Sequence, residues 1–264
     1  MNIFKRELKA NLKSLLIWGV VVILFTILGV SKFSAYYNNP DMLSFLNSLP
    51  ESVLKILNTA AFNLTTVTGF FGIMFTYSAL LLSISAAMWG SDIIAKEQRD
   101  KTVEFSLTLP VTRSRVVFSK TLAALVNCVI LLLITWGVSI ITAQPYQPDA
   151  EFYRFMALCI LALFILQPVF LSIGVLLGCA LKRYKMASST ALFVLLGTYF
   201  ISVATTLNSN LGFLKVFSPF AYFDPAAMLH DSSINLGFVG LSIAIVAVSL
   251  FAARTNYEKR DLYI

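Results

Sequence analysis

Long apolar runs alternate with short polar segments along the whole chain. Each run holds about 20 mainly apolar residues, the length that an α-helix needs to cross a bilayer. The runs lack the apolar–polar alternation that is typical of barrel strands. They therefore predict an all-α polytopic membrane protein with a single transmembrane domain over residues 1–264. The predicted spans cover residues 15–36, 69–90, 118–142, 153–181, 186–207 and 234–253.

Composition and charge agree with this class. Apolar residues make up 58% of the chain and charged residues 12%, against about 25% charged residues in a soluble domain. Of the 20 Lys and Arg residues, all but Lys32, Lys55, Arg154 and Lys215 lie on one side of the predicted topology. Because Lys and Arg concentrate in cytoplasmic segments, both termini are predicted to be cytoplasmic in a multi-pass protein of the cell (plasma) membrane. This topology accounts for the net charge of +7 without a nucleic-acid partner.

Two segments outside the spans have patterns of their own. In residues 1–14, Phe4 and Leu8 recur at helical spacing among Lys and Arg, which favours an amphipathic interfacial helix over a plain basic flank. The run that follows is interpreted as an uncleaved first span, since no small-residue cleavage site comes after it. Residues 208–233 are aromatic-rich and are interrupted by two prolines. They predict either a re-entrant hairpin or an interfacial loop on the outer side.

Residues that could carry chemistry are scarce. The apolar cores of the spans hold no Asp, Glu, Lys or Arg, which argues against a proton-driven carrier and a cation channel. Asn127 and Gln167 are polar residues within spans, and an interhelical hydrogen bond is the simplest role for them. The chain lacks a P-loop motif. It is therefore predicted to have no catalytic residues and to bind no cofactor or metal by itself.

Small residues within the spans indicate close packing. Gly174 and Gly178 form a G-x-x-x-G motif, which suits either a contact between helices of one chain or a dimer interface. Cys128, Cys159 and Cys179 all fall in apolar runs. A cysteine in such a place acts as a small packing residue rather than as part of a disulfide framework.

Residues 91–117 form the longest charged segment between two spans. The helix of the second span is predicted to continue into it, because Glu97 and Lys101 are opposite charges four residues apart. Pro110 ends any such helix, and Thr112 can cap the helix that follows. The resulting elbow has an apolar centre and a charged rim. It fits either a protein-docking patch or an ordinary cytoplasmic loop.

This segment resembles the coupling segment of the membrane subunit, or permease, of a type-2 ABC exporter of the compact six-span bacterial kind. In that family, a Glu follows the second span. Then come Lys/Arg-Thr-x-Glu, Leu, Pro, Val, a small hydroxyl residue, Arg, and a Lys that opens the third span. This chain has Glu97, Lys101-Thr102-Val103-Glu104, Leu107, Leu109-Pro110-Val111-Thr112-Arg113 and Lys120. The spans, the amphipathic start and the outer segments also match, so the resemblance covers essentially the whole chain.

The resemblance implies the permease subunit of an ATP-driven ABC transporter that works as an exporter. Its coupling segment would sit in a cleft of a separate cytoplasmic ABC ATPase subunit, which would bind the ATP and magnesium. A second permease, either another copy or a related chain, would complete the assembly in the lipid bilayer. The substrate stays open between a peptide, a lipid-like compound, a drug and an ion. The residues that would carry the ATPase coupling are Glu97, Lys101, Thr102, Glu104, Pro110 and Arg113.

Two other functions also fit the sequence. The chain could be a sensor or assembly subunit that uses the same ATPase coupling without transport. It could instead be a membrane enzyme with an outer-face site at His230, which lies beside Asp231. Sequence neighbours rarely form a catalytic constellation, because separate elements usually assemble one. The permease is therefore the favoured hypothesis, and by itself it would not be an enzyme.

Overall fold

The computed structural model describes residues 3–39, 62–99, 112–181 and 183–259, with single positions between 41 and 54. The long helices are α1 (Ile3–Tyr36), α4 (Val67–Arg99), α6 (Arg113–Ala143), α7 (Ala150–Ala180), α8 (Tyr184–Leu207) and α10 (Leu236–Lys259). The short helices are η1 (Gln144–Tyr146), η2 (Ser209–Phe217), η3 (Pro219–Tyr222) and α9 (Pro225–Asp231). Within the described residues, six helices are long and apolar enough to cross a membrane, and each overlaps one predicted span. The all-α prediction is confirmed.

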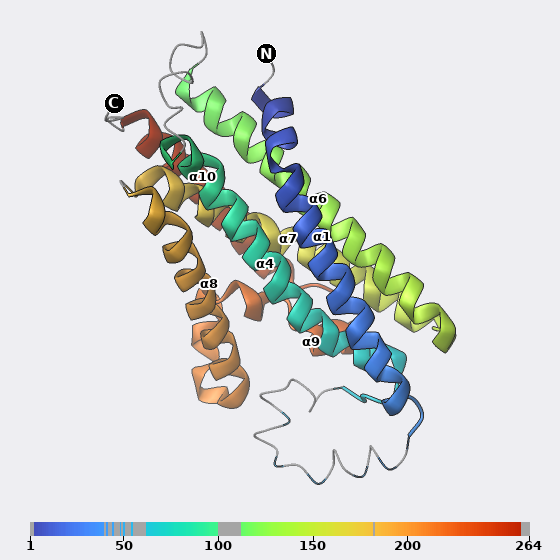
Figure 1. Ribbon diagram of the computed structural model, residues 1–264. Helices are drawn as coiled ribbons and strands as arrows, with labels where there is room; N and C mark the ends of the chain where they lie inside the picture. Colours follow the sequence, from blue (N-terminus) through green and yellow to red (C-terminus); the bar gives the residue numbers. More distant parts are fainter. Residues whose placement is uncertain are drawn as a thin grey trace.

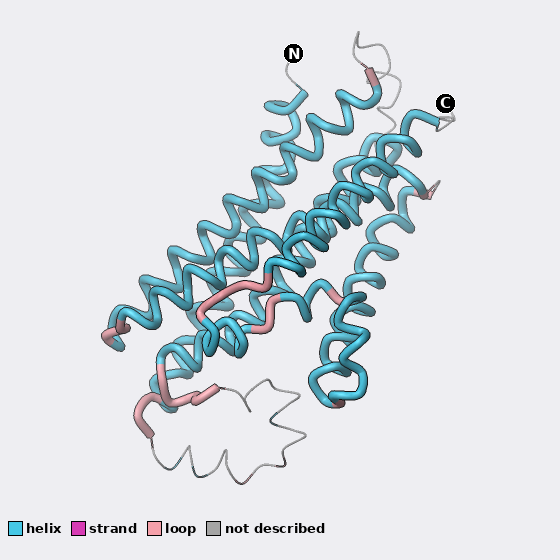
Figure 2. Tube along the Cα trace, turned by 180° about the vertical axis from the view of Figure 1, so that it is seen from behind, coloured by secondary structure: helices cyan, strands magenta, loops and turns pink. Residues whose placement is uncertain are grey.

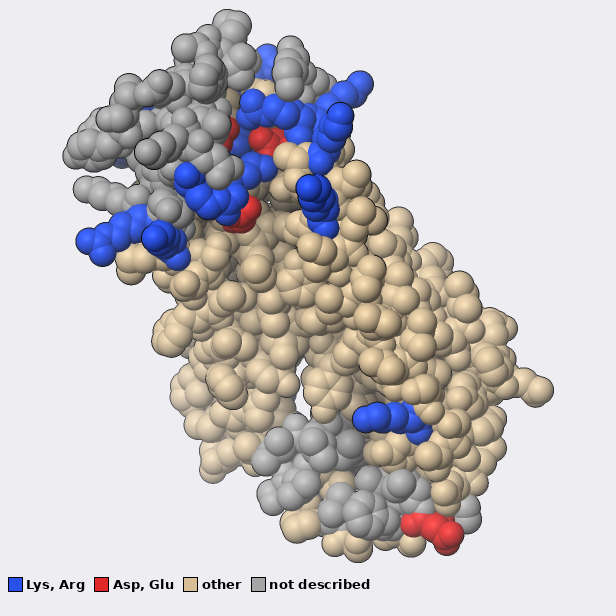
Figure 3. Space-filling view, in the orientation of Figure 1, with Lys and Arg blue, Asp and Glu red and all other residues tan. Residues whose placement is uncertain are grey.

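The helices α4 and α7 form the centre of the bundle. α7 packs along α4 and against α10, while α1 packs along α6, and α8 lies against α4 (Figures 1 and 2). α1 begins and α10 ends at the same end of the bundle, which we call the terminal end (Figure 1). Lys and Arg side chains gather at this end (Figure 3). The second predicted span continues as a helix to Arg99 there, as its charge pattern indicates.

Glycines bring α4 and α7 into backbone contact. A Cβ atom on Gly174 would lie 2.5 Å from the carbonyl oxygen of Ala87, and one on Gly178 would lie 2.8 Å from that of Ser91. On α4, Gly90 meets the backbone of α7 at Leu171 in the same way. Only glycine allows helices to approach so closely. The G-x-x-x-G motif therefore makes an internal helix contact, which settles the alternative that the sequence left open.

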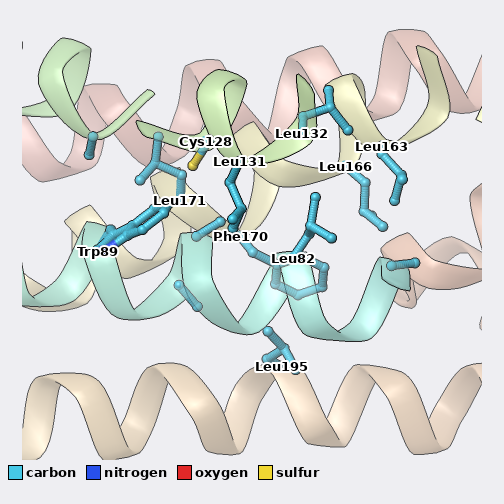
Figure 4. Close-up of a cluster of buried hydrophobic side chains, with 14 of the residues drawn as sticks. Leu82, Trp89, Cys128, Leu131, Leu132, Leu163, Leu166, Phe170, Leu171 and Leu195 are labelled. Carbon is cyan, nitrogen blue, oxygen red and sulfur yellow. The ribbon is translucent and has the colours of Figure 1, made fainter. Parts of the chain in front are cut away.

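Large apolar side chains fill the remaining space around this contact. Leu82 and Trp89 of α4 meet Leu131 of α6 and Phe170 of α7 in a single core (Figure 4). Cys128, Cys159 and Cys179 are buried and free of disulfides. They serve as packing residues, as their positions predict. Leu195 of α8 is fully buried against α4 on the other side.

The start of the chain differs from its prediction. The described residues from Ile3 onward are the first turns of α1, which runs to Tyr36 as one helix of 34 residues. A separate interfacial helix over residues 1–14 is therefore not seen. No Gly or Pro occurs between Ile3 and Trp18, and the buried face of α1 there carries Glu7, Asn11 and Leu15. A helix of this length spans about 50 Å, well beyond the roughly 30 Å of bilayer hydrocarbon.

Residues 208–233 fold back along α8. The hydroxyl of Ser218 donates to the carbonyl oxygen of Thr198 at 2.7 Å. Thr198 lies nine residues before α8 ends at Leu207, which corresponds to about 14 Å along the helix. The ring of Phe220 packs 4.9 Å from that of Phe170, in the middle of α7. This path fits the re-entrant alternative rather than a loop confined to the end of the bundle.

Two polar residues in the predicted spans lack the expected bonds. Asn127 and Gln167 are buried, at 1% and 2% exposure. Among the described residues, the side-chain amide nitrogens of both have no hydrogen-bond partner. The predicted interhelical hydrogen bonds are therefore not donated in this conformation.

Candidate functional site

A buried group of charges joins three helices at the terminal end. We call it the ion cluster, and it consists of Arg6, Glu7, Lys96, Glu97 and Lys120. Lys120 Nζ lies 2.9 Å from Glu97 Oε1 and 3.3 Å from Glu7 Oε1. Lys96 forms an ion pair with Glu7. Arg6 lies at the rim, 3.5 Å from Glu7 and 3.6 Å from Glu97.

Burial distinguishes this cluster from an ordinary surface network. The side chain of Lys120 is 1% exposed, that of Glu7 2% and that of Glu97 7%. Taking such charges out of water costs several kcal/mol per ion, so each needs close partners. Lys120 Nζ obtains a further partner by donating to the carbonyl oxygen of Ile93 at 3.0 Å. The ammonium group of α6 thus ties the last turns of α4 to the first turns of α1.

A second contact holds α1 against α4 closer to the bundle centre. The indole Nε1 of Trp89 donates to the hydroxyl of Ser14 at 2.9 Å. Ser14 lies seven residues after Glu7 on α1, and Trp89 lies seven residues before Lys96 on α4. A spacing of seven residues keeps two positions on one face of a helix. α1 and α4 are therefore fastened at two levels on matching faces.

The structure places Glu97 inside the molecule. We predicted it as a coupling residue that contacts the ATPase or fixes the elbow. It is 5% exposed and faces α1 and α6 at the base of the coupling segment, residues 91–117. This position suits the fixing role, because a direct contact with a partner would require the ion cluster to open. Lys101, the predicted helical partner of Glu97, lies outside the described residues.

Arg113 anchors the other end of the coupling segment. Its Nη1 donates to the carbonyl oxygens of Glu258 at 3.2 Å and Tyr257 at 3.5 Å, in the last turn of α10. Carbonyls in a last turn have no partner within the helix, and a cation stabilises them. Thr112 lies at the N-cap position of α6, as predicted, but its side chain makes no capping hydrogen bond.

The other predicted coupling residues lie between these two anchors. Lys101, Thr102, Glu104 and Pro110 fall outside the described residues. Their predicted roles stay predictions. The structure therefore describes the surroundings of two predicted coupling residues. Glu97 lies at the base of the coupling segment, and Arg113 lies at its exit.

Glu7 and Lys96 were missed as functional candidates. The basic residues near Glu7 favour a membrane-surface helix, and the charges around Lys96 are those of an exposed helix end. A signal was available in the sequence. The buried stripe of α1 at Leu15 and Val22 extends backward through Asn11 to Glu7 at helical spacing. A single acidic residue on that stripe needs a basic partner from another helix.

His230 lies in the last turn of the short helix α9 and is exposed. Its side chain is 90% exposed, and its Nδ1 lies 2.9 Å from Asp231 Oδ1. Within the described part of the chain, this carboxylate is its only hydrogen-bond partner. No nucleophile from another element is brought against the ring there, so the arrangement gives the enzyme hypothesis no support.

These features define a class of protein: a multi-pass helical membrane protein whose helices are joined by buried ion pairs at one charged end. A family model described as "ABC-2 family transporter protein" matches residues 1–262. The chain therefore belongs to the ABC-2 transporter family and is a permease subunit of an ABC transporter. Membrane proteins of this family work with ABC ATPase subunits. Among curated proteins, none matches this chain.

Proposed function

We propose that this permease is driven by a separate cytoplasmic ABC ATPase that docks on the coupling segment, and that it exports its substrate. ATP and magnesium are held by the ATPase, while this chain forms the membrane path and has no ATPase activity of its own. The observation that carries the proposal is the bracing on both sides of the docking segment. Its base is fixed by the ion cluster, and its exit is fixed by Arg113 on α10.

Bracing of this kind suits the transmission of force. A flexible loop would absorb a displacement imposed by a partner, whereas a segment fixed at both ends passes it to its helices. At the base, movement of Glu97 pulls on Lys120 of α6 and, through it, on Glu7 of α1. At the exit, movement of Arg113 acts on α6 and on the end of α10. Closure of the ATPases would thus reach four helices of the permease together.

The orientation follows from charge. The terminal end carries most of the Lys and Arg side chains (Figure 3), which favours a cytoplasmic position. We place both termini in the cytoplasm and the protein in the cell (plasma) membrane. A second permease, identical or related, completes the pair that two ATPases need. The second permease is proposed from the family alone.

Co-purification tests the docking. A C-terminally tagged chain is extracted from native membranes in mild detergent, and co-purifying proteins are identified by mass spectrometry. We expect a P-loop ATPase with the unmodified chain and its loss with Glu104→Ala or Pro110→Ala. The matched control is Lys215→Ala, which removes an exposed charge at the opposite end of the bundle. A well-folded chain that brings down no ATPase would overturn the docking proposal.

Transport is tested separately in vesicles. The permease and its ATPase are reconstituted, and ATP-dependent movement of candidate peptides, lipid-like compounds, drugs and ions is followed. Flux out of the ATP-containing compartment supports the exporter. Flux in the opposite sense would overturn the direction. ATP hydrolysis that depends on the permease but moves no tested compound would favour a sensor or assembly subunit.

A further inference from the structure

A groove opens between α6, α7 and α10 toward the terminal end. Its cavity volume is about 610 Å³. It is lined by Phe118 and Leu122 of α6, by Leu250 and Phe251 of α10, and by Pro168 of α7. The ion cluster and Arg113 do not line this groove, but Thr112, Ser114 and Arg115, at the exit of the coupling segment, do.

The groove is long and runs along the helices. On α6, the lining residues Arg115 and Leu125 are ten residues apart, and on α10, Arg254 and Val246 are eight residues apart. These spacings correspond to about 15 Å and 12 Å along the helix axes. Because both helices have their basic lining residue nearer the terminal end, the groove is basic there. It is apolar toward the middle of the bundle.

Its basic end carries an excess of positive charge. Arg254 Nε pairs with Glu258 at 3.0 Å. Arg115 is exposed and forms no ion pair with any residue that the structure describes. Among the described residues, Glu258 balances one of the two guanidinium groups, and the other is available to an anion. Guanidinium groups bind phosphate oxygens through two parallel hydrogen bonds, a geometry that ammonium groups do not offer.

We propose that this groove binds one anionic phospholipid from the leaflet at the terminal end. Its phosphate lies at Arg115 and Arg254, and an acyl chain runs along Phe118, Leu122 and Leu250. Basic pockets between membrane helices bind anionic headgroups by the same combination of charge and depth. Charge complementarity selects this occupant, since an apolar helix from a second copy would leave Arg115 without an anion. The site goes beyond the proposed transport function and does not depend on it.

The groove joins three helices, so its occupant has a structural effect. The lining of α7 at Pro168, Leu171 and Ser172 lies between α6 and α10. An acyl chain there fills the space between α6 and α10 and supplies apolar contacts to Phe118 and Phe251, which are 68% and 70% exposed. Bound lipid should therefore stabilise the folded permease in proportion to its occupancy.

Native mass spectrometry of the purified, delipidated full-length chain tests the site. The probes are phosphatidylglycerol, which is anionic, phosphatidylcholine, which is zwitterionic, and inorganic phosphate. We expect one tightly bound phosphatidylglycerol. The Kd should rise about tenfold with Arg115→Gln, the loss of one charge-assisted contact. Arg183→Gln is the matched control, because Arg183 is exposed at the same end but does not line the groove.

A second variant separates the apolar part of the site from its charge. Leu122→Trp fills the groove without altering any charge, and it should weaken phosphatidylglycerol binding while the chain stays folded. Equal binding of phosphatidylcholine, or equal losses from Arg115→Gln and Arg183→Gln, would overturn the proposal. If inorganic phosphate displaced phosphatidylglycerol completely, the groove would be a simple anion site and the lipid proposal would be wrong. A change in the dimer fraction with unchanged lipid binding would assign the groove to a second copy instead.

Discussion

Glu7 is predicted to be among the most sensitive charged residues of the permease. The variant Glu7→Gln leaves the shape of the side chain nearly unchanged but removes the charge that faces Lys96 and Lys120. Lys120 is 1% exposed, so its ammonium group cannot regain water without local unfolding. Removing one partner of a buried pair costs about 3–5 kcal/mol. Because Lys120 keeps Glu97 and a backbone carbonyl, we expect the lower part of that range, about 3 kcal/mol.

The size of the coupling is worked out with a double-mutant cycle. Lys120→Met alone leaves Glu7 and Glu97 facing one another with reduced compensation, and it should cost at least as much as Glu7→Gln. The double variant removes one charge of each sign, so its loss should be smaller than the sum. We expect an interaction free energy of about 2 kcal/mol, within the range for neighbours in one ion network.

The cycle is measured by equilibrium unfolding of the purified permease in mixed detergent micelles. Asp92→Asn supplies the control, since the pair of Asp92 and Arg99 is at the same end but is 41% and 47% exposed. An exposed pair contributes about 0–1 kcal/mol. Two results would refute the reasoning: a Glu7→Gln loss no larger than that of Asp92→Asn, or single losses that add without interaction. Either would mean that water reaches the cluster and screens it.

Four further changes follow from the packing and from the anchor at Arg113. Gly174→Ala should lower the free energy of unfolding by about 1–3 kcal/mol, because its Cβ meets the backbone of Ala87. Gly197→Ala, with open space around it, should be neutral or gain up to about 1 kcal/mol in the same unfolding assay. Asn127→Leu should be neutral or stabilising, since its amide nitrogen is buried without a partner; an inactive but stable variant would instead show a role in transport. Arg113→Met should free the last turn of α10 and raise amide hydrogen exchange there, and unchanged exchange would contradict the anchoring role.

The membrane helices could be predicted because their cause is local. Runs of about 20 apolar residues specify a spanning helix whatever surrounds them, and the distribution of Lys and Arg follows their ends. The sequence predicts a close helix contact at Gly174, but the G-x-x-x-G motif does not identify the helix that makes it. The return of residues 208–233 along α8 depends on contacts with distant residues, such as the hydrogen bond from Ser218 to Thr198 and the ring contact of Phe220 with Tyr199. No periodic pattern reports such a bond.

The candidate site was harder to predict because its partners come from three helices. Glu97 was identified through the family motif, yet its sequence neighbours indicated an exposed charge. Its burial depends on Arg6, 91 residues earlier, and on Lys120, 23 residues later. Local propensity carries no information about such distant charges. Single acidic residues on a buried helical stripe are the one local clue, and they become informative only when the partner helix is known.

The contacts around α4 explain how a movement at the terminal end can reach the rest of the permease. At its base, α4 is tied to α1 and α6 by the ion cluster. About two turns further in, Gly90 and the α7 glycines bring the two backbones into direct contact, with no flexible side chain between them. On its other face, Ser91 shares a hydrogen bond of 3.0 Å with Ser188 of α8. Displacement of α4 must therefore shift α7 and α8 together. A movement of the coupling segment would pass first through the ion cluster and then through the glycine contact. Weakening either contact should therefore uncouple ATP hydrolysis from transport, while the ATPase still docks.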